Sequence, residues 1–278
     1  MKTDLRVAVC TNRSPDAALE ALRDQVPAEA LTVVVSGRED PAFLSEPRPG
    51  LSRARNRALE WAAGAGADVL AFVDDDALVD PGWYDALRAR WDEAPADVAC
   101  IGGPIRPRFS VPPPGWFSDG IAHVLTLVDR GRSVRDLDPD VEAVYGANIS
   151  FRVEPLRAAG GFDPSLGHSG SRVYFGEEDE AQRTLVRLGY RVRYGPDAGV
   201  THVIPAERLT RGSFLRRRYA FGQALGARGG RLRALAARQA LTSGAGAAGA
   251  AVTGRHALAM ERAVRAAENL GVLTARRR

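Results

Sequence analysis

Short apolar segments alternate with segments of helical periodicity along the first part of the chain. The apolar runs have the length of buried strands and lie at residues 5–10, 31–35, 68–73 and 98–101. Apolar residues at helical spacing occur after Pro15, over 51–63, and from Pro81 to about residue 93. This alternation predicts a parallel sheet that is covered by helices on both faces.

The pattern changes after residue 104. A long connection rich in proline and aromatic residues follows at 104–120, and connections of this kind often line a site. Further strands are expected at 141–151, 190–194 and 199–203, and further helices at 154–159 and 177–188. Residues 167–174 are rich in glycine and serine, which is typical of a mobile segment.

From Thr210 onward the pattern predicts arginine-rich helices. The Ala/Gly stretch at 244–254 is the weak point of this part, and we expect it to be either a loop between helices or a poorly ordered linker. The chain contains no internal repeat.

Composition places the chain among ordinary globular proteins. Hydrophobic residues make up 45% and charged residues 26% of 278 residues, which excludes wholesale disorder. The net charge is +4, and arginine supplies nearly all of the basicity because Lys2 is the only lysine. Cys10 and Cys100 lie in apolar segments, which predicts buried thiols and argues against a disulfide framework or a zinc site.

The sequence shows neither a secretion signal nor a membrane-spanning segment. The first residues lack an apolar h-region, and no apolar run reaches the roughly 18 residues that a bilayer requires. We therefore expect a cytoplasmic protein. Arginines cluster in the C-terminal part with only Glu207 as a nearby acid: Arg208, Arg211, Arg216, Arg217, Arg218, Arg228, Arg231, Arg233 and Arg238.

Two interpretations of this arginine cluster stay open. It could bind phosphate groups in general, or it could form a solvated helix face. We expect the helical tail to shape one side of a site and to contact anionic lipid peripherally at the inner face of the membrane. Nucleic acid is not an expected partner.

Three adjacent carboxylates, Asp74, Asp75 and Asp76, directly follow the apolar run LAFV. Ligands of such sheets bind outside the carboxyl ends of the strands, where residues 11–13 are also expected. Adjacent carboxylates repel one another, and a hard divalent cation such as Mg²⁺ or Mn²⁺ would neutralise them while sharing its other positions with phosphate and water. The alternative is an ordinary acidic turn that caps the next helix.

A second acidic cluster opens the helix expected at 177–188, in the segment GEEDE. The helix dipole favours negative charge there, so an ordinary helix start explains the cluster as well as a functional base does. His202 ends an expected strand, as do the aspartates. A histidine in such a place is more often packed or on the surface, but Asp76 and His202 could converge on one metal.

These pieces occur together in one order: VAVCTNR, GLSRARNRALEWA, ADVLAFVDDDALVDPGW, VYGANISFRVEPLRAAGGFD, GEEDEAQRTLVRLGYRV and AGVTHVI. In that order and spacing, the chain resembles the family 2 glycosyltransferases over about residues 5–225. The resemblance implies an α/β GT-A fold, which is a Rossmann-like mixed sheet flanked by helices. It places a catalytic domain at 1–209, with a donor half at about 1–103 and an acceptor half at about 104–209, and a helical extension at 210–278.

The resemblance also implies roles for individual residues. Asp74 and Asp76 correspond to the family's Asp-x-Asp motif, with Asp74 toward the nucleotide ribose and Asp76, completed by His202, toward a metal on the diphosphate. The other residues expected to bind the donor are Thr11, Asn12, Arg13, Ser36, Arg55, Asp75, Gly146 and Asn148. Arg55 falls where the family approaches the nucleotide or diphosphate, and Gly146 and Asn148 match a loop beside the donor sugar.

The family's catalytic carboxylate falls on Glu178 when the helix is counted back from Gly189, and a shift of one position would select Asp179. We prefer Glu178 because the ungapped count keeps Leu185 in register. The chain departs from the family at Ser36, which stands where the family usually carries an acidic residue that recognises the nucleotide base. Asp40 could compensate from the following loop.

The expected function is therefore inverting transfer of a sugar from a UDP-, GDP- or dTDP-sugar to a hydroxyl acceptor, assisted by Mn²⁺ or Mg²⁺. The acceptor could be a glycan, a lipid-linked sugar or a secondary metabolite. Two rivals would use Asp74 and Asp76 differently. A haloacid-dehalogenase-type phosphatase usually needs a lysine, and Lys2 is badly placed, whereas a nucleotidyltransferase typically begins with a glycine-rich phosphate loop that this chain lacks.

Overall fold

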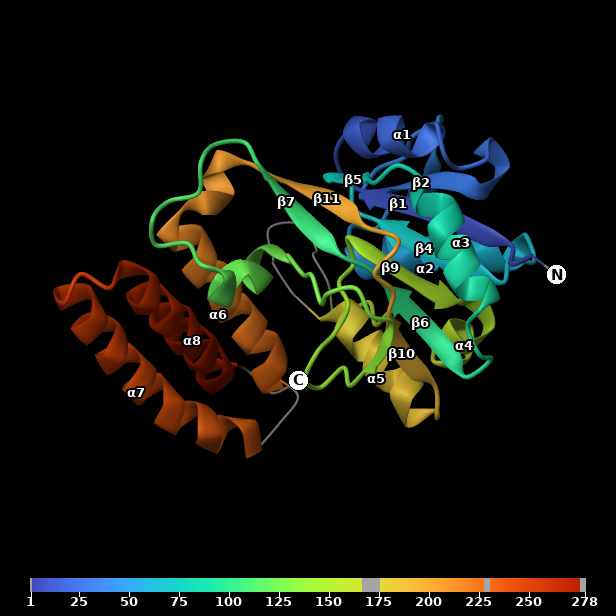
Figure 1. The fold of residues 1–278 in the computed structure, drawn as a ribbon. Helices are drawn as coiled ribbons and strands as arrows, with labels where there is room; N and C mark the ends of the chain where they lie inside the picture. The colour runs from blue at the N-terminus through green and yellow to red at the C-terminus, as the bar shows by residue number, and fades with distance from the viewer. Residues whose placement is uncertain (1, 167–175, 228–230, 276–278) are drawn as a thin grey trace. The chain divides into compact units, whose positions relative to one another are not determined.

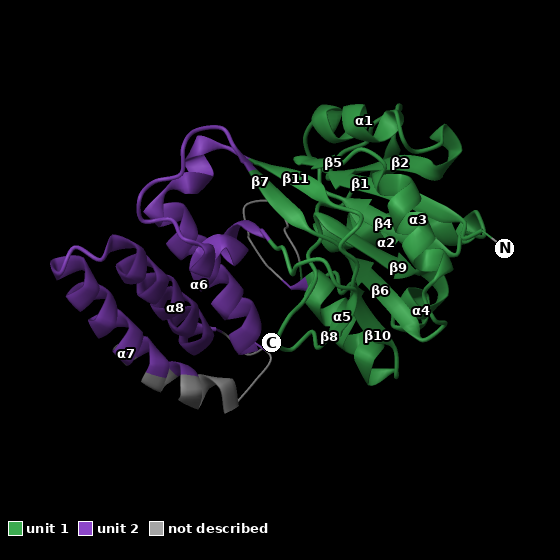
Figure 2. Cartoon of the chain, in the orientation of Figure 1, with its two compact units in different colours: residues 1–107, 128–171, 177–203 green, residues 108–127, 172–176, 204–278 purple. Residues whose placement is uncertain are grey.

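The computed structural model describes residues 2–166, 176–227 and 231–275, so the segment expected to be mobile at 167–174 lies outside them. The chain divides into two compact units (Figure 2). Unit 1 comprises residues 1–107, 128–171 and 177–203, and unit 2 comprises 108–127, 172–176 and 204–278. The proline- and aromatic-rich connection is thus divided between them, and the C-terminal stretch of unit 2 starts at 204. The division into a domain at 1–209 and an extension at 210–278 stays a prediction.

An eight-stranded mixed sheet forms the centre of unit 1, in the order β3-β2-β1-β4-β9-β6-β10-β8 (Figure 1). Its strands are β1 (Leu5–Thr11), β2 (Leu31–Ser36), β3 (Leu44–Glu46), β4 (Val69–Val73), β6 (Val98–Gly102), β8 (Arg135–Leu137), β9 (Asn148–Arg152) and β10 (Arg191–Tyr194). The first four strands in this order are parallel, as the sequence predicts, and β9 runs antiparallel to both of its neighbours. The predicted fold class is confirmed.

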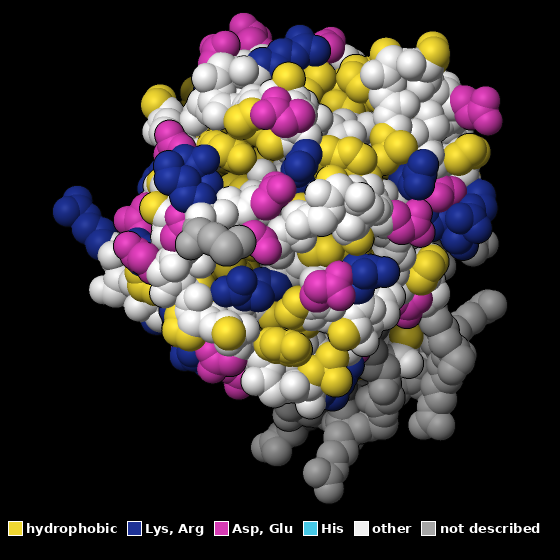
Figure 3. Space-filling model, turned by 90° about the vertical axis from the view of Figure 1, so that its right-hand side faces the viewer, with side chains coloured by type: hydrophobic (Ala, Val, Ile, Leu, Met, Phe, Trp, Pro, Cys, Tyr) yellow, Lys and Arg dark blue, Asp and Glu magenta, His cyan; other side chains and the backbone are white. Residues whose placement is uncertain are grey.

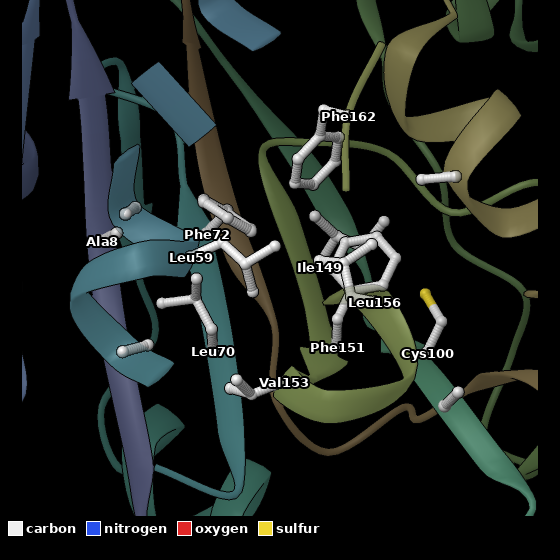
Figure 4. Close-up of a cluster of buried hydrophobic side chains, with 14 of the residues drawn as sticks. Ala8, Leu59, Leu70, Phe72, Cys100, Ile149, Phe151, Val153, Leu156 and Phe162 are labelled. Atoms are coloured by element: carbon white, nitrogen blue, oxygen red, sulfur yellow. The ribbon is translucent and has the colours of Figure 1, made fainter. Parts of the chain in front are cut away.

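Helices cover both faces of this sheet. They are α1 (Asp16–Arg23), α2 (Leu51–Gly64), α3 (Trp83–Asp92), α4 (Val153–Ala158) and α5 (Glu177–Arg187), with a 3-10 turn at Ala28–Ala30. The alternation of side chains along β9 separates the two faces. Ile149 and Phe151 join the apolar cluster with α2, α4 and α5 (Figure 4), whereas Ser150 accepts a hydrogen bond from Trp91 of α3.

Aromatic rings fill the centre of that cluster. Phe72, Phe151 and Phe162 form three mutual edge-to-face contacts, with centroid separations of 5.5–6.4 Å. Such pairs add to the free energy gained by burying the rings. Cys10 and Cys100 are buried free thiols, as predicted.

The strand expected at 141–151 is shorter than predicted, because regular pairing begins only at Asn148. The side chain of Gln182 takes the place of a neighbouring strand at Val144. Its Oε1 accepts from the Val144 N–H at 3.0 Å and its Nε2 donates to the Val144 carbonyl at 2.9 Å. Residues 141–147 therefore form a loop next to α5.

A second, three-stranded sheet has the order β5-β11-β7, with β5 at Ala77–Val79, β11 at Val200–Ile204 and β7 at Ile105–Phe109. In unit 2, the 3-10 segments Asp119–Leu125 and Ala206–Leu209 accompany helices α6 (Arg211–Ala227), α7 (Arg231–Val252) and α8 (His256–Thr274). The stretch 244–254, expected to be a loop or linker, is helical as far as Val252. The expectation was wrong because alanine is the best helix former and offsets the cost of the glycines.

Glycines let α6 and α8 approach closely. A Cβ atom at Gly222 would lie 2.0 Å from the Glu268 carbonyl oxygen, and one at Gly271 would lie 2.1 Å from that of Tyr219. A larger residue at either position would push the helices apart. None of the helices among the described residues is both long and apolar enough to cross a membrane.

Candidate functional site

The carboxyl ends of β1 and β4 meet at one edge of the sheet. The strands are adjacent and parallel, with Val9 opposite Val73, so the residues that follow them lie side by side. Thr11 donates a hydrogen bond to Asp75. Arg13 donates from Nε to Asp75 at 2.9 Å and from Nη2 to Asp76 at 2.9 Å. The prediction that both segments share this edge is confirmed.

His202 comes to this edge from the small sheet. β11 pairs with β5 so that His202 lies opposite Ala77, and the Val203 N–H donates to the Asp76 carbonyl at 2.9 Å. This pairing puts Nε2 of His202 3.2 Å from Oδ1 of Asp76. The His202 side chain is only 3% exposed. The two residues therefore converge as expected.

The residues at this point fit a divalent cation that is completed by substrate. The described residues contain no group of three or more His, Cys, Asp or Glu side chains that could hold a metal on their own. Mg²⁺ is usually bound through one or two carboxylates together with substrate phosphates and water, so a full protein cage is not needed. Asp76 and His202 offer a carboxylate oxygen and an imidazole nitrogen, and such an ion would take its remaining ligands from phosphate and water.

Arg55 of α2 is buried among acidic residues on the other side of the aspartates. Its side chain is 2% exposed, and Nη1 lies 2.9 Å from Oε1 of Glu177 and 3.5 Å from Oε2 of Glu178. Nη2 lies 3.7 Å from Oδ1 of Asp74. The guanidinium also lies over the rings of Phe72 and Phe162, 5.6 Å from each centroid. Arg55 thus joins Asp74 to the start of α5.

The pKa values of the two glutamates at the start of α5 are shifted in opposite directions. Burial and the neighbouring charge of Glu178 raise the pKa of Glu177 well above its usual range. Burial also opposes ionisation of Glu178, but Arg55, the hydrogen bond from Glu177 and main-chain N–H groups outweigh it, so the pKa of Glu178 is lowered. The pKa shifts thus favour the protonated form at Glu177 and the ionised form at Glu178, with a hydrogen bond between the two carboxyl groups.

Asp74 is the least enclosed member of this group, with 36% of its side chain exposed. Burial within the site and the charge of Asp76 raise the pKa of Asp74 to about 6, although Arg55 acts in the opposite direction. A cation bound beside Asp76 would counter the effect of Asp76.

Glu178 and Asp179 differ in access to the site. The Glu178 side chain is 16% exposed, whereas Asp179 is buried with 6% of its surface exposed. A base must reach the proton that it takes, so geometry favours Glu178. Glu177 and Gln182 contribute to the site, but the sequence marked Glu177 only as a neighbour of the base and gave no signal for Gln182.

Asn148 has its amide committed within the protein. Its Oδ1 accepts from Trp83 Nε1 at 3.1 Å, and its Nδ2 donates to the carbonyls of Pro104 at 3.1 Å and Ala198 at 2.8 Å. It is 2% exposed. Its expected part in donor binding stays a prediction, and this arrangement favours an indirect part in which Asn148 fixes the start of β9 against Trp83, Pro104 and Ala198.

The residues expected to recognise the nucleotide base lie near the end of β2. Ser36 Oγ accepts from the Gly50 N–H at 3.0 Å and so fixes the start of α2. Arg38 donates to the Asn12 carbonyl at 2.9 Å and lies 3.9 Å from Asp40. Arg38 and Asp40 therefore offer a donor and an acceptor beside Asn12, where Ser36 supplies no acid.

Comparison with known proteins identifies the family. The sequence model described as "Glycosyl transferase family 2" matches residues 2–157. The chain belongs to glycosyl transferase family 2. It is 30% identical over 154 residues to the glucosyl-dolichyl phosphate glucuronosyltransferase of Haloferax volcanii, covering 55% of this chain and 47% of that protein. It is 28% identical over 229 residues to the succinoglycan biosynthesis protein ExoM of Rhizobium meliloti, covering 80% and 64%.

Solved structures of two glycosyltransferases share the fold of this family 2 member. The mannosyltransferase PcManGT of Pyrobaculum calidifontis, in complex with GDP-Man and Mn²⁺, has a TM-score of 0.55 at 20% identity, over 83% of this chain and 66% of that chain. GalNAc-T7 with UDP, GalNAc and Mn²⁺ has a TM-score of 0.54 at 15% identity, over 81% and 51%. The chain spans about half to two thirds of its curated relatives' lengths, 47% and 64%.

Proposed function

We propose that the protein is an inverting glycosyltransferase that moves a sugar from a nucleotide-sugar donor to a hydroxyl acceptor in one displacement. The observation that carries the proposal is the convergence of Asp76 and His202 at the carboxyl edge of the sheet, with Glu178 joined to Asp74 through Arg55. Family membership and the donors and Mn²⁺ named in the two solved structures support it.

On the donor side, Asp76 and His202 would hold Mn²⁺ or Mg²⁺. When bound, the cation neutralises the charge that develops on the departing nucleoside diphosphate. Asp74 would contact the ribose, while Thr11 and Arg13 would border the nucleoside. The Arg13 guanidinium contacts Asp75 and Asp76 in this structure, so it can change partners when a diphosphate enters.

On the acceptor side, Glu178 would take the proton of the attacking hydroxyl as the new glycosidic bond forms. Its lowered pKa keeps it ionised and ready to accept. Because the hydroxyl oxygen attacks the anomeric carbon from the side opposite the leaving diphosphate, the configuration at that carbon inverts. In this proposal Glu178 is the base, and Asp179, the next residue of α5, is the alternative.

Nothing in the site favours the rival activities. A phosphatase of the haloacid-dehalogenase type would need Asp74 free as a nucleophile and a lysine beside it, whereas Asp74 lies 3.7 Å from the buried guanidinium of Arg55. A nucleotidyltransferase would need a glycine-rich phosphate loop after β1, where this chain has Thr11, Asn12 and Arg13.

We further propose that the C-terminal helices contact anionic lipid from the cytoplasmic side of a membrane. Exposed Arg211 and Arg216 on α6 support an electrostatic contact. On the face drawn in Figure 3, basic and acidic side chains are interspersed, so this one face carries no uniformly basic surface. Sedimentation with vesicles of anionic lipid at low salt tests the contact, and absence of binding would exclude it.

A panel of UDP-, GDP- and dTDP-sugars tests the main proposal by thermal unfolding in the presence of Mn²⁺. A donor that binds the native state raises the apparent unfolding temperature. We expect at least one donor to raise the unfolding temperature of the wild type, and to raise that of Asp76→Ala by less. If no donor shifts the wild type, sugar transfer from nucleotide donors is contradicted.

A further inference from the structure

Arg55 combines deep burial with contacts to three carboxylates that come from two distant segments. Asp74 follows β4 on the donor side, and Glu177 and Glu178 begin α5 on the acceptor side. To bind a diphosphate, an arginine must present its N–H donors to the open site. The Arg55 guanidinium is instead 2% exposed and enclosed by Phe72 and Phe162. The five N–H donors of arginine lie in a rigid fork, so a buried arginine can fix several carboxylates at once.

Gly146 supplies an independent observation. A Cβ atom at this position would lie 2.1 Å from Nη2 and 3.0 Å from Cζ of Arg55, and the three nearest atoms all belong to that guanidinium. Gly146 is not among the residues with positive φ, so its backbone does not require glycine. The space that glycine leaves at 146 is therefore occupied by Arg55.

We propose that Arg55 is a positioning residue that fixes Glu178 relative to Asp74 without contacting the donor, and that Gly146 is glycine in order to admit its guanidinium. This inference rests on the proposed function, because it assigns how the base of that reaction is held. It also departs from the expectation that Arg55 approaches the nucleotide or diphosphate. Arg55 would set the distance between the base and the donor side.

Arg55→Ala and Gly146→Ala, with Arg57→Ala as the matched control, separate a positioning role from diphosphate binding. Arg57 lies on the same helix, pairs with Glu60 at 3.3 Å and is 42% exposed. We expect Arg55→Ala to lower kcat by about a hundredfold or more, in keeping with loss of a preorganised electrostatic partner. Calorimetric affinity for UDP, GDP and dTDP with Mn²⁺ should stay at the wild-type value. Arg55→Lys, which keeps the charge but not the fork, should recover part of kcat.

Gly146→Ala should also lower kcat in the wild type but add little in the Arg55→Ala background, because the Cβ atom then meets no guanidinium. An equal loss in both backgrounds would overturn the assigned role of Gly146. A fall in nucleoside-diphosphate affinity of Arg55→Ala with kcat retained would overturn the positioning role and make Arg55 a diphosphate ligand. Unchanged kcat and affinity would overturn it as well.

Thermal unfolding tests the role of Arg55 independently of sugar transfer. A wild type that turns over no donor contradicts sugar transfer but leaves the acidic cluster testable. Arg55→Ala should lower the unfolding temperature by leaving buried carboxylates unpaired, and adding Glu177→Gln and Glu178→Gln should restore part of the loss. No restoration would overturn the coupling of Arg55 to these glutamates, whatever the activity.

Discussion

His202 Nε2 lies 3.2 Å from Asp76 Oδ1, although the two residues are far apart in the sequence. The pairing of β5 with β11 places them together, because Ala77 next to the aspartate lies opposite His202. The metal site proposed for this family 2 member therefore depends on a short edge of the small sheet as well as on the acidic motif itself.

Removing either partner should impair metal-dependent transfer. We expect Asp76→Ala to lower turnover by about a hundredfold or more, because the charge on the leaving diphosphate would lose its counter-ion. His202→Ala should raise the Mn²⁺ concentration required for half-maximal rate. Turnover measured against Mn²⁺ concentration checks both, and Asp85→Ala, at an exposed position on α3, serves as the control. Wild-type Mn²⁺ dependence in His202→Ala would contradict the assigned site.

The two glutamates of α5 should respond oppositely to the same substitution. Glutamine resembles a protonated glutamate and can still donate to Glu178, so Glu177→Gln should retain most of the turnover. Glu178→Gln removes the base and should lower kcat by at least about a hundredfold. Steady-state kcat for the two variants checks this, with Asp179→Asn alongside. If Asp179→Asn is the inactive variant and Glu178→Gln is active, the base is Asp179.

Asn148 should matter for stability. Asn148→Ala removes the partner of the Trp83 indole N–H and of the Ala198 carbonyl, whereas the Pro104 carbonyl keeps the Val200 N–H, and each unsatisfied buried group costs about 1–3 kcal/mol. We expect a fall of at least about 2 kcal/mol in the free energy of unfolding, measured by denaturant titration. An unchanged unfolding curve together with a weaker affinity for the donor would instead indicate a direct contact with the sugar.

Ion pairs along β8 and β10 should make stability depend on pH. Arg193 and Arg191 lower the pKa of Asp136, and Arg135 lowers that of Glu142. A lowered folded-state pKa stabilises the protein fully above the unfolded-state value of about 4 and loses this contribution as the pH falls through the folded-state value. The free energy of unfolding should therefore decrease on acidification below about pH 4.

The raised pKa of Glu177 makes the free energy of unfolding increase on acidification, which is the opposite effect. A variant is therefore needed to isolate the contribution of Asp136. Asp136→Asn removes one of the lowered carboxyls and should show a smaller loss of stability on acidification than the wild type, as measured by denaturant titration at several pH values. An identical dependence on pH in the two proteins would contradict this assignment.

The sheet edge was predictable because apolar runs and the polar residues after them are local features of the sequence. Parallel strands bring such residues together, so residues 11–13 and 74–76 were expected at one edge, and Thr11 contacts Asp75 there. The environment of Arg55 was not predictable, because its partners come from β4 and α5 and no spacing relates them. The shortened β9 was missed for a similar reason, since Gln182 occupies the edge that a strand would use.

Turnover of nucleotide-sugar donors with and without chelation tests the central claim most directly. Wild-type protein is incubated with each donor and a mixture of glycan, lipid-linked and small hydroxyl acceptors, and release of nucleoside diphosphate is measured. We predict that at least one donor is consumed, that EDTA stops the reaction, and that added Mn²⁺ restores it in the wild type but not in Asp76→Ala. A rate that EDTA leaves unchanged would contradict the account.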